Sequence, residues 1–296
     1  MDVPVDVWVQ IIASGLTLGA MYAVAAIGLA LVYGSLNMLN MAHGALMALG
    51  GYICFYTMTQ LGMPALVGVA AAMVVCGAVG LAIYLAAAQP MLRSANFETQ
   101  IFIATIGIGA ILENVILRAF GPQPQPQSLN LTGALVIGNV HIPNQNLLIL
   151  AVALGLMVVL SLLLRHTRLG RAIRATAQNR EAAQLMGVRV SLVYAQVLAL
   201  SGALAAISGI MVSSLSGLLP NMGGDPMLKA FIICVVAGLG NVYGTVATAI
   251  VLGLLEAWIQ YVLGVRYSFA LLLLLVIVVL IWRPYGLFGR KQVVRL

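Results

Sequence analysis

A succession of long apolar stretches with few charges between them constrains this chain more than any other feature. Of its 296 residues, 62% are hydrophobic and only 7% are charged. A soluble domain carries about 25% charged residues, so this chain has too few to cover a surface in contact with water. Apolar runs of about 20 residues can each cross a bilayer as a helix, because a helix satisfies its backbone hydrogen bonds internally. We therefore expect an all-α, polytopic membrane helix bundle that forms a single transmembrane domain over residues 1–296.

The apolar runs predict eight long transmembrane helices plus one short, broken piece. The short piece is Met227–Leu239, which is too short to span a bilayer alone and follows the Pro- and Gly-rich letters SGLLPNMGGDP. The eight long spans are expected at Trp8–Val32, Ala45–Met58, Ala65–Ala88, Phe97–Leu117, Leu147–Leu164, Leu192–Ser213, Thr245–Leu263 and Ser268–Trp282.

The positive charges predict the orientation of these spans. The net charge is +7, and most of the Arg and Lys residues lie in segment 165–190 or after residue 282. Cytoplasmic loops of membrane proteins carry such an excess, which argues against nucleic acid as a partner. We therefore place segment 165–190 and the C-terminus in the cytoplasm. The acidic N-terminus and the Pro- and Gln-rich loop 121–146, in which LVIGNVHI resembles a small hairpin, then lie on the periplasmic side.

Polar residues interrupt the apolar pattern at two places. The letters LVYGSLNMLNMAHGALMALGGY at 31–52 contain Asn37, Asn40 and His43, and the second interruption lies within 223–244. Paired interruptions of this kind indicate a weak internal repeat and a transport pathway near the breaks, and we expect the two breaks to lie close together. The other interpretation is that these groups hold the broken backbone. His43 has no Cys, Asp or second His beside it, so we expect no metal site there.

Ionisable residues within apolar spans are costly and usually face the bundle interior or water. Glu113, Glu256 and the pair Asp225 and Lys229 are of this kind. Asp225 and Lys229 are four residues apart, so a helix places them on one face, where they can pair. These side chains either join helices or line a path for a solute. They form no relay of acids, which disfavours a proton pump.

Segment 165–190 is an Ala-rich, basic stretch of helix-forming residues that Gly187 can cap at its end. An exposed basic helix on the cytoplasmic face can bind anionic lipid. Its small residues also permit close docking in the groove of a partner protein, and we favour docking.

Three motifs together resemble the inner-membrane permeases of the high-affinity branched-chain amino acid ABC importer family. They are LNMAHGALMALGGY, GRAIRATAQNREAAQLMGV and KAFIICVVAGLGNVYGTVATAIVLGLLE, and the resemblance extends from about residue 10 to 290. It implies a bacterial inner-membrane permease subunit that imports a small polar solute, above all a branched-chain or other amino acid. Some relatives import urea, short amides or other small organic solutes.

The resemblance also implies partners and residue roles. The importers of this family are completed by a second, usually different permease subunit, two cytoplasmic ATPase subunits and a periplasmic solute-binding protein. ATP and Mg²⁺ would bind to the ATPases, and this chain would hold no cofactor and catalyse no reaction. The implied pathway residues are Asn37, Asn40, His43, Glu113, Asp225, Lys229 and Glu256. The implied ATPase-coupling residues are Gly170, Arg171, Arg174, Ala182, Ala183, Met186 and Gly187.

Two other classes remain as alternatives to the importer subunit. One is a self-contained secondary carrier or channel, and the other is a membrane enzyme. The chain lacks the phosphate-binding motif G-x-x-x-x-G-K-[ST], because neither Lys229 nor Lys291 follows a glycine. That fits both an importer subunit and a carrier. The basic, Ala-rich segment favours the importer subunit, and no catalytic constellation supports an enzyme.

Overall fold

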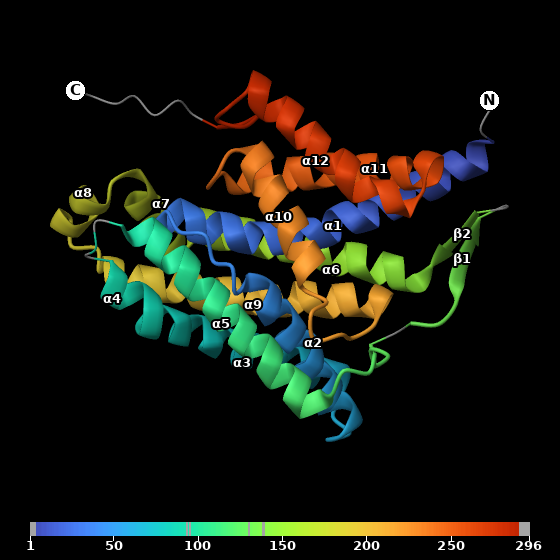
Figure 1. The fold of residues 1–296 in the computed structure, drawn as a ribbon, viewed down its shortest axis with the longest axis horizontal. Coiled ribbons are helices and arrows are strands. Elements are labelled where there is room, and N and C mark those ends of the chain that lie inside the picture. The colour runs from blue at the N-terminus through green and yellow to red at the C-terminus, as the bar shows by residue number, and fades with distance from the viewer. Residues whose placement is uncertain (1–3, 93, 95, 130, 138–139, 290–296) are drawn as a thin grey trace.

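A computed structural model describes residues 4–92, 94, 96–129, 131–137 and 140–289, and in these ranges the chain is a helix bundle with one small hairpin (Figure 1). The predicted helix bundle is therefore confirmed. The helices are α1 (Val5–Leu36), α2 (His43–Thr59), α3 (Ala65–Ile83), α4 (Gln89–Met91), α5 (Phe97–Phe120), α6 (Asn144–His166), α7 (Arg168–Gln178), α8 (Arg180–Leu185), α9 (Val190–Ser216), α10 (Gly224–Ala237), α11 (Val242–Leu263) and α12 (Val265–Trp282). A π-helical turn, Tyr84–Ala88, joins α3 to α4.

Seven helices in the described part of the chain are long and apolar enough to cross a membrane, rather than the eight expected. The difference lies in Ala45–Met58, which belongs to α2, a helix of only 17 residues. The backbone turns at Asn37, whose φ is +52°, and α2 begins six residues later. Helix α10 has 14 residues, as expected for a piece too short to span alone.

The two ends of the bundle differ (Figure 1). The N-terminal end of α1 lies beside the antiparallel strands β1 (Ala134–Ile137) and β2 (Val140–Pro143), which confirms the predicted hairpin. Helices α7 and α8 lie at the opposite end. The hydroxyls of Thr59, the last residue of α2, and Ser128 are 2.7 Å apart, so α2 ends beside the loop that leads to the hairpin. The segments predicted to lie on opposite sides of the membrane are therefore at opposite ends of the molecule.

The long helices pair crosswise between the two halves of the chain. The order of long helix, break, short helix and long helix occurs first as α1, α2 and α3 and again as α9, α10 and α11. Helix α1 packs along α11, and α3 packs along α9. Glycines lie at both contacts: a Cβ added at Gly19 would meet the backbone of α11, and one added at Gly202 would overlap the carbonyl oxygen of Cys76 on α3. This equivalent packing supports the predicted internal repeat.

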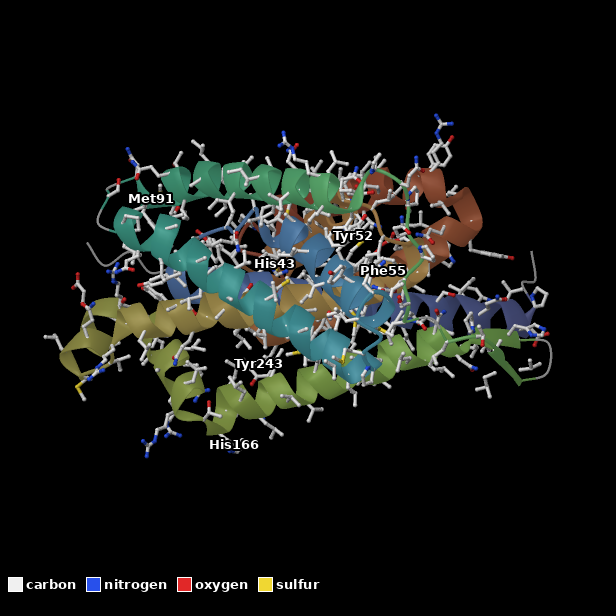
Figure 2. The ribbon with its side chains drawn as sticks, turned by 90° about the horizontal axis from the view of Figure 1, so that it is seen from below. His43, Tyr52, Phe55, Met91, His166 and Tyr243 are labelled. Carbon is white, nitrogen blue, oxygen red and sulfur yellow. The ribbon has the colours of Figure 1, made fainter. Side chains whose placement is uncertain are left out.

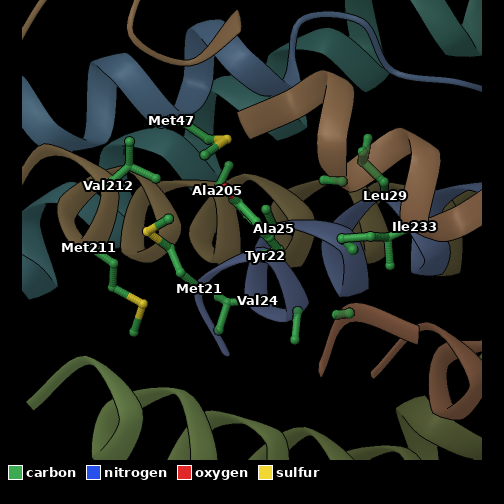
Figure 3. Close-up of a cluster of buried hydrophobic side chains, with 14 of the residues drawn as sticks. Met21, Tyr22, Val24, Ala25, Leu29, Met47, Ala205, Met211, Val212 and Ile233 are labelled. Carbon is green, nitrogen blue, oxygen red and sulfur yellow. The ribbon is translucent and has the colours of Figure 1, made fainter. Parts of the chain in front are cut away.

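Helix α1 lies in the middle of the core. Ala23, Ala25, Ala26 and Ala30 have no exposed surface, and these small side chains let neighbouring helices approach closely. Larger side chains from α1, α2, α9 and α10 fill the remaining space (Figure 3). The polar residues discussed below therefore lie among tightly packed apolar groups.

The close contact between α3 and α9 predicts that Gly202→Ala destabilises the fold. The new methyl group has to displace backbone of α3, and overpacking of this kind costs about 1–3 kcal/mol. We expect the melting temperature of the purified protein in detergent to fall by several degrees. Gly155→Ala on α6 is the matched control, because a Cβ there meets no atom within 4 Å. Equal melting temperatures for the two variants would contradict this description of the contact.

Candidate functional site

The two short helices begin next to each other in the interior of the bundle. A Cβ built on Gly44, in the first turn of α2, would lie 2.7 Å from the carbonyl oxygen of Gly223, the residue before α10. From this contact, α2 and α10 run in different directions (Figure 1). The N-terminal end of a helix carries partial positive charge from its free N–H groups, and here two such ends meet. The expectation that the two breaks lie close together is therefore confirmed, and we call the Gly44–Gly223 contact the junction.

Side chains of the protein form hydrogen bonds with the backbone N–H groups that are left unpaired at the first break, between α1 and α2. The side-chain oxygen of Asn40 accepts a hydrogen bond from Ala42 N at 3.1 Å, and Thr105 Oγ1 on α5 accepts one from Met41 N at 3.1 Å. Asn40 is 2% exposed, so it does not face lipid. An unsatisfied backbone group in lipid costs several kcal/mol, and these two side chains remove that cost.

His43 begins α2 and is fully buried near the middle of the molecule (Figure 2). Its Nδ1 lies 3.5 Å from Ser201 Oγ on α9, and that hydroxyl donates to the carbonyl of Gly28 on α1 at 3.0 Å. A Cβ added at Gly28 would be 2.8 Å from His43 Cε1. The imidazole therefore fills the space that Gly28 leaves and joins three helices near the junction. Candidate metal-binding groups of three or more acidic, His or Cys residues are absent from the described part of the chain.

Lys229 forms an ion pair with Glu256, not with Asp225 as the spacing predicted. Its Nζ lies 2.5 Å from Glu256 Oε1 on α11 and donates to the hydroxyl of Tyr22 on α1 at 2.9 Å. Gln260 Nε2 also donates to Glu256 Oε1, at 3.1 Å. The prediction fails because α10 turns Lys229 inward towards α1 and α11, whereas Asp225 is exposed at the start of α10. The ion pair thus links α10 to both neighbouring helices.

The other ionisable candidates lie outside this network. Asp225 is exposed, and Glu113 is half-buried on α5. Among the described residues, Glu113 makes no hydrogen bond or ion pair that connects it to the junction. Asn37 is exposed at the end of α1. The structure therefore brings Asn40 and His43 to one side of the junction and Lys229 and Glu256 to the α10 side, and separates Asn37 and Glu113 from them.

Sequence reasoning missed three polar residues of this region, namely Tyr22, Thr105 and Ser201. Each is a hydroxyl-bearing residue within a predicted apolar span. A hydroxyl in such a span is ordinary, because it can bond to its own helix. Thr105 Oγ1 does so as well, donating to the carbonyl of Ile101 at 2.9 Å. Only the fold shows that these hydroxyls also reach other helices.

Segment 165–190 forms two helices instead of the single helix expected. Thr167 caps α7 by accepting from Gly170 N at 3.0 Å, and Asn179 caps α8 by accepting from Ala182 N at 3.0 Å. The Asn179 backbone is extended, which interrupts the helix between α7 and α8. Gly187 has a φ of +83° just after α8, so the predicted glycine cap is confirmed.

The predicted coupling residues divide between an inner and an outer face. Gly170 and Ala183 are buried against the chain itself, and the Arg174 guanidinium donates to the carbonyl of Leu164. On the outer face, Leu185 is 88% exposed and Met186 is 85% exposed. The exposed members of the predicted set are Arg171, Arg174, Ala182, Met186 and Gly187.

The helix order, the paired breaks and the exposed helical segment at one end define a polytopic membrane permease. The sequence matches the family described as "Branched-chain amino acid transport system / permease component" over residues 11–281, and the chain belongs to this family. It is thus a multi-pass membrane protein with a transporter fold.

Individual relatives match along almost the whole chain. The permease protein BraD of the high-affinity branched-chain amino acid transport system of Pseudomonas aeruginosa is 32% identical, over 97% of this chain and 97% of that protein. The corresponding LivH protein of Escherichia coli K12 is 29% identical with the same coverage. Among solved structures, PsaBC from Streptococcus pneumoniae in complex with Fab has a TM-score of 0.50 at 12% identity, covering 90% of each chain. This last likeness concerns the fold alone.

The ion pair predicts that Lys229→Met destabilises the protein strongly. Glu256 is 1% exposed, and removing one partner of a buried ion pair costs about 3–5 kcal/mol. The double variant Lys229→Met/Glu256→Gln removes the stranded charge and should recover most of the loss in melting temperature. Additive losses in the double variant would show that the two side chains do not stabilise each other.

Proposed function

We propose that this chain is a permease subunit of an ATP-driven importer that moves branched-chain amino acids into the cytoplasm. The observation that carries the proposal is the family match across nearly the whole chain, shared with relatives named for branched-chain amino acid transport. The alternatives of urea or short amides as solutes, and of a self-contained carrier or channel, have no comparable support.

The proposal includes partner subunits that supply energy and solute. Two cytoplasmic ATPases bind ATP and Mg²⁺, a periplasmic protein delivers the amino acid, and a second permease completes the pathway. The exposed pair Leu185 and Met186 supports the ATPase part. Large apolar side chains at the end of a basic helical segment suit a groove in a partner protein. This chain then hydrolyses no ATP itself.

The orientation of the chain in the membrane follows from its proposed role as an importer subunit. Helices α7 and α8 face the cytoplasm together with the C-terminus, and the hairpin β1–β2 and the N-terminus face the periplasm of a cell with an inner membrane. The concentration of arginines in α7 and α8 supports this orientation.

The pathway runs along the face of the bundle on which Asp225 is exposed. A carboxylate is costly in lipid, so this face is covered by the second permease or by water. Asp225 and the converging positive ends of α2 and α10 then present opposite charges, which suits the ammonium and carboxylate of a zwitterion. Behind this face, the junction is supported by the buried polar side chains of Asn40, His43, Lys229 and Glu256. Asn37 lies at the cytoplasmic mouth, and Glu113 lies on the periplasmic half of α5.

A reconstituted importer tests the function and the coupling role together. We expect vesicles that contain this chain, its partner permease, both ATPases and the binding protein to take up leucine with ATP, and not urea. Met186→Asp places a charge on the docking surface and should lower uptake at least about tenfold, a loss of about 1.4 kcal/mol of docking energy.

The fold should survive this change, because Met186 is almost fully exposed. Gln123→Asp is the matched control, since it adds the same charge at an exposed position in the loop at the opposite end of the bundle. Wild-type ATPase binding and uptake by Met186→Asp would refute the docking role. ATP-dependent uptake of urea and not of leucine would refute the proposed solute.

A further inference from the structure

The segment after α12, residues 283–289, folds back onto the end of α10 at Ala237. Leu287 N donates to the carbonyl of Val236 at 2.7 Å, and Phe288 N donates to that of Ala237 at 3.0 Å. The last carbonyls of a helix have no partner within the helix. Residues 283–289, which we call the C-terminal segment, supply donors for two of them.

The C-terminal segment contacts this helix end backbone against backbone. Gly238 follows α10 with a φ of +97°, and a Cβ built on it would lie 2.6 Å from Gly289 N. A Cβ built on Gly286 would lie 2.5 Å from Gly238 N. Glycines on both sides therefore allow an approach that side chains would prevent.

One side chain joins the C-terminal segment to the start of the next helix. Asn241 Oδ1 accepts from Gly244 N at 3.0 Å and so caps α11. Its Nδ2 donates to the carbonyl of Phe288 at 3.1 Å. The amide thus uses its acceptor for the helix cap and its donor for the C-terminal segment.

The corner between α10 and α11, residues 238–243, also meets α1 and the base of the α7–α8 segment. Gly240 packs against Gly34 near the end of α1. Arg165, at the end of α6, donates through Nε to the hydroxyl of Tyr243 at 3.0 Å, and its guanidinium lies 5.2 Å from the ring centroid. A cavity of about 510 Å³, lined by Arg174, Asn241 and Phe288 among others, separates α7 from the corner. Arg165, in the last turn of α6 and just before α7, thus connects the corner to the helix that leads into the α7–α8 segment, beside this open space.

We propose that the C-terminal segment is a clamp that fixes the α10–α11 corner, and that Asn241 is the positioning residue that closes it. Helix α10 runs without interruption from this corner to Gly224, beside the junction. A displacement of the clamped corner therefore displaces the junction. Movement of α7 and α8 reaches the corner through Arg165 and Tyr243 and then passes along α10. The clamp stands on its own geometry, and its role in transport rests on the proposed function.

Two substitutions of Asn241 separate its two hydrogen bonds. Asn241→Asp and Asn241→Ser each keep an oxygen that can cap α11. The Asp carboxylate has no donor for the carbonyl of Phe288, and the shorter Ser side chain does not extend its hydroxyl to the place of the Asn241 Nδ2. In the assembled complex, we expect slow hydrogen exchange at the amides of Leu287 and Phe288. Both variants should raise that exchange at least about fivefold, as the loss of one hydrogen bond implies. Exchange in the first turns of α11 should stay unchanged, and leucine uptake should fall at least about fivefold.

A second pair of variants tests the backbone contact directly. Leu287→Pro removes the N–H that bonds to Val236, whereas Leu287→Ala keeps it and shortens a side chain that is 46% exposed. Only the proline variant should lose exchange protection at Phe288 and lower uptake.

Three outcomes would overturn the proposal. Fast exchange at both amides in the wild type would show that the clamp is absent. Faster exchange in the Asn241 variants with normal uptake would show that the clamp does not position α10 for transport. Equal effects of Leu287→Pro and Leu287→Ala would assign the result to the side chain. If the wild-type complex does not transport leucine, the proposed function fails, while the exchange data still decide whether the clamp exists.

Discussion

The need to satisfy every backbone N–H and C=O group away from water governs this structure. Seven long helices meet that need by themselves, but the breaks around α2 and α10 expose backbone groups in the bundle. Each break is satisfied by groups from elsewhere in the chain: Thr105 on α5 serves the first, and the C-terminal segment serves the carbonyl end of α10. The breaks thus depend on segments distant in sequence, and this dependence explains why short helices persist in a membrane bundle.

Much of this architecture follows from periodicity and composition. The long spans, the hairpin near residues 134–143, the shortness of α10 and the glycine cap after α8 are all properties of local sequence. The closeness of the two breaks could also be predicted, because isolated polar groups in lipid are costly. The count of eight long spans is not confirmed, since an apolar run records hydropathy and not where the backbone turns. Asn37 ends α1 so that the following helix is shortened.

Pairing between distant side chains could not be predicted in the same way. Lys229 and Asp225 have the spacing of a helical ion pair, yet the partner of Lys229 is Glu256, 27 residues further along the chain. Which of two carboxylates pairs with a lysine depends on the rotation of α10 about its axis. Packing against α1 and α11 fixes that rotation. The division of the coupling residues, with Ala183 buried and Met186 exposed, depends in the same way on how α8 rests on the bundle.

The crosswise packing of the long helices has a consequence for biosynthesis. Helix α1 is made before the other described helices and is the most deeply enclosed of the long ones among them, with 89% of its most apolar 18-residue stretch buried. Its main partner, α11, starts more than 200 residues later. Until α11 leaves the ribosome, the side of α1 that carries Gly19 and packs against α11 has only lipid or the insertion machinery as a neighbour. Contacts of such long sequence separation form late and slowly. Until then the nascent chain lacks the main partner of α1, and the core around α1 closes only after α11 has been inserted.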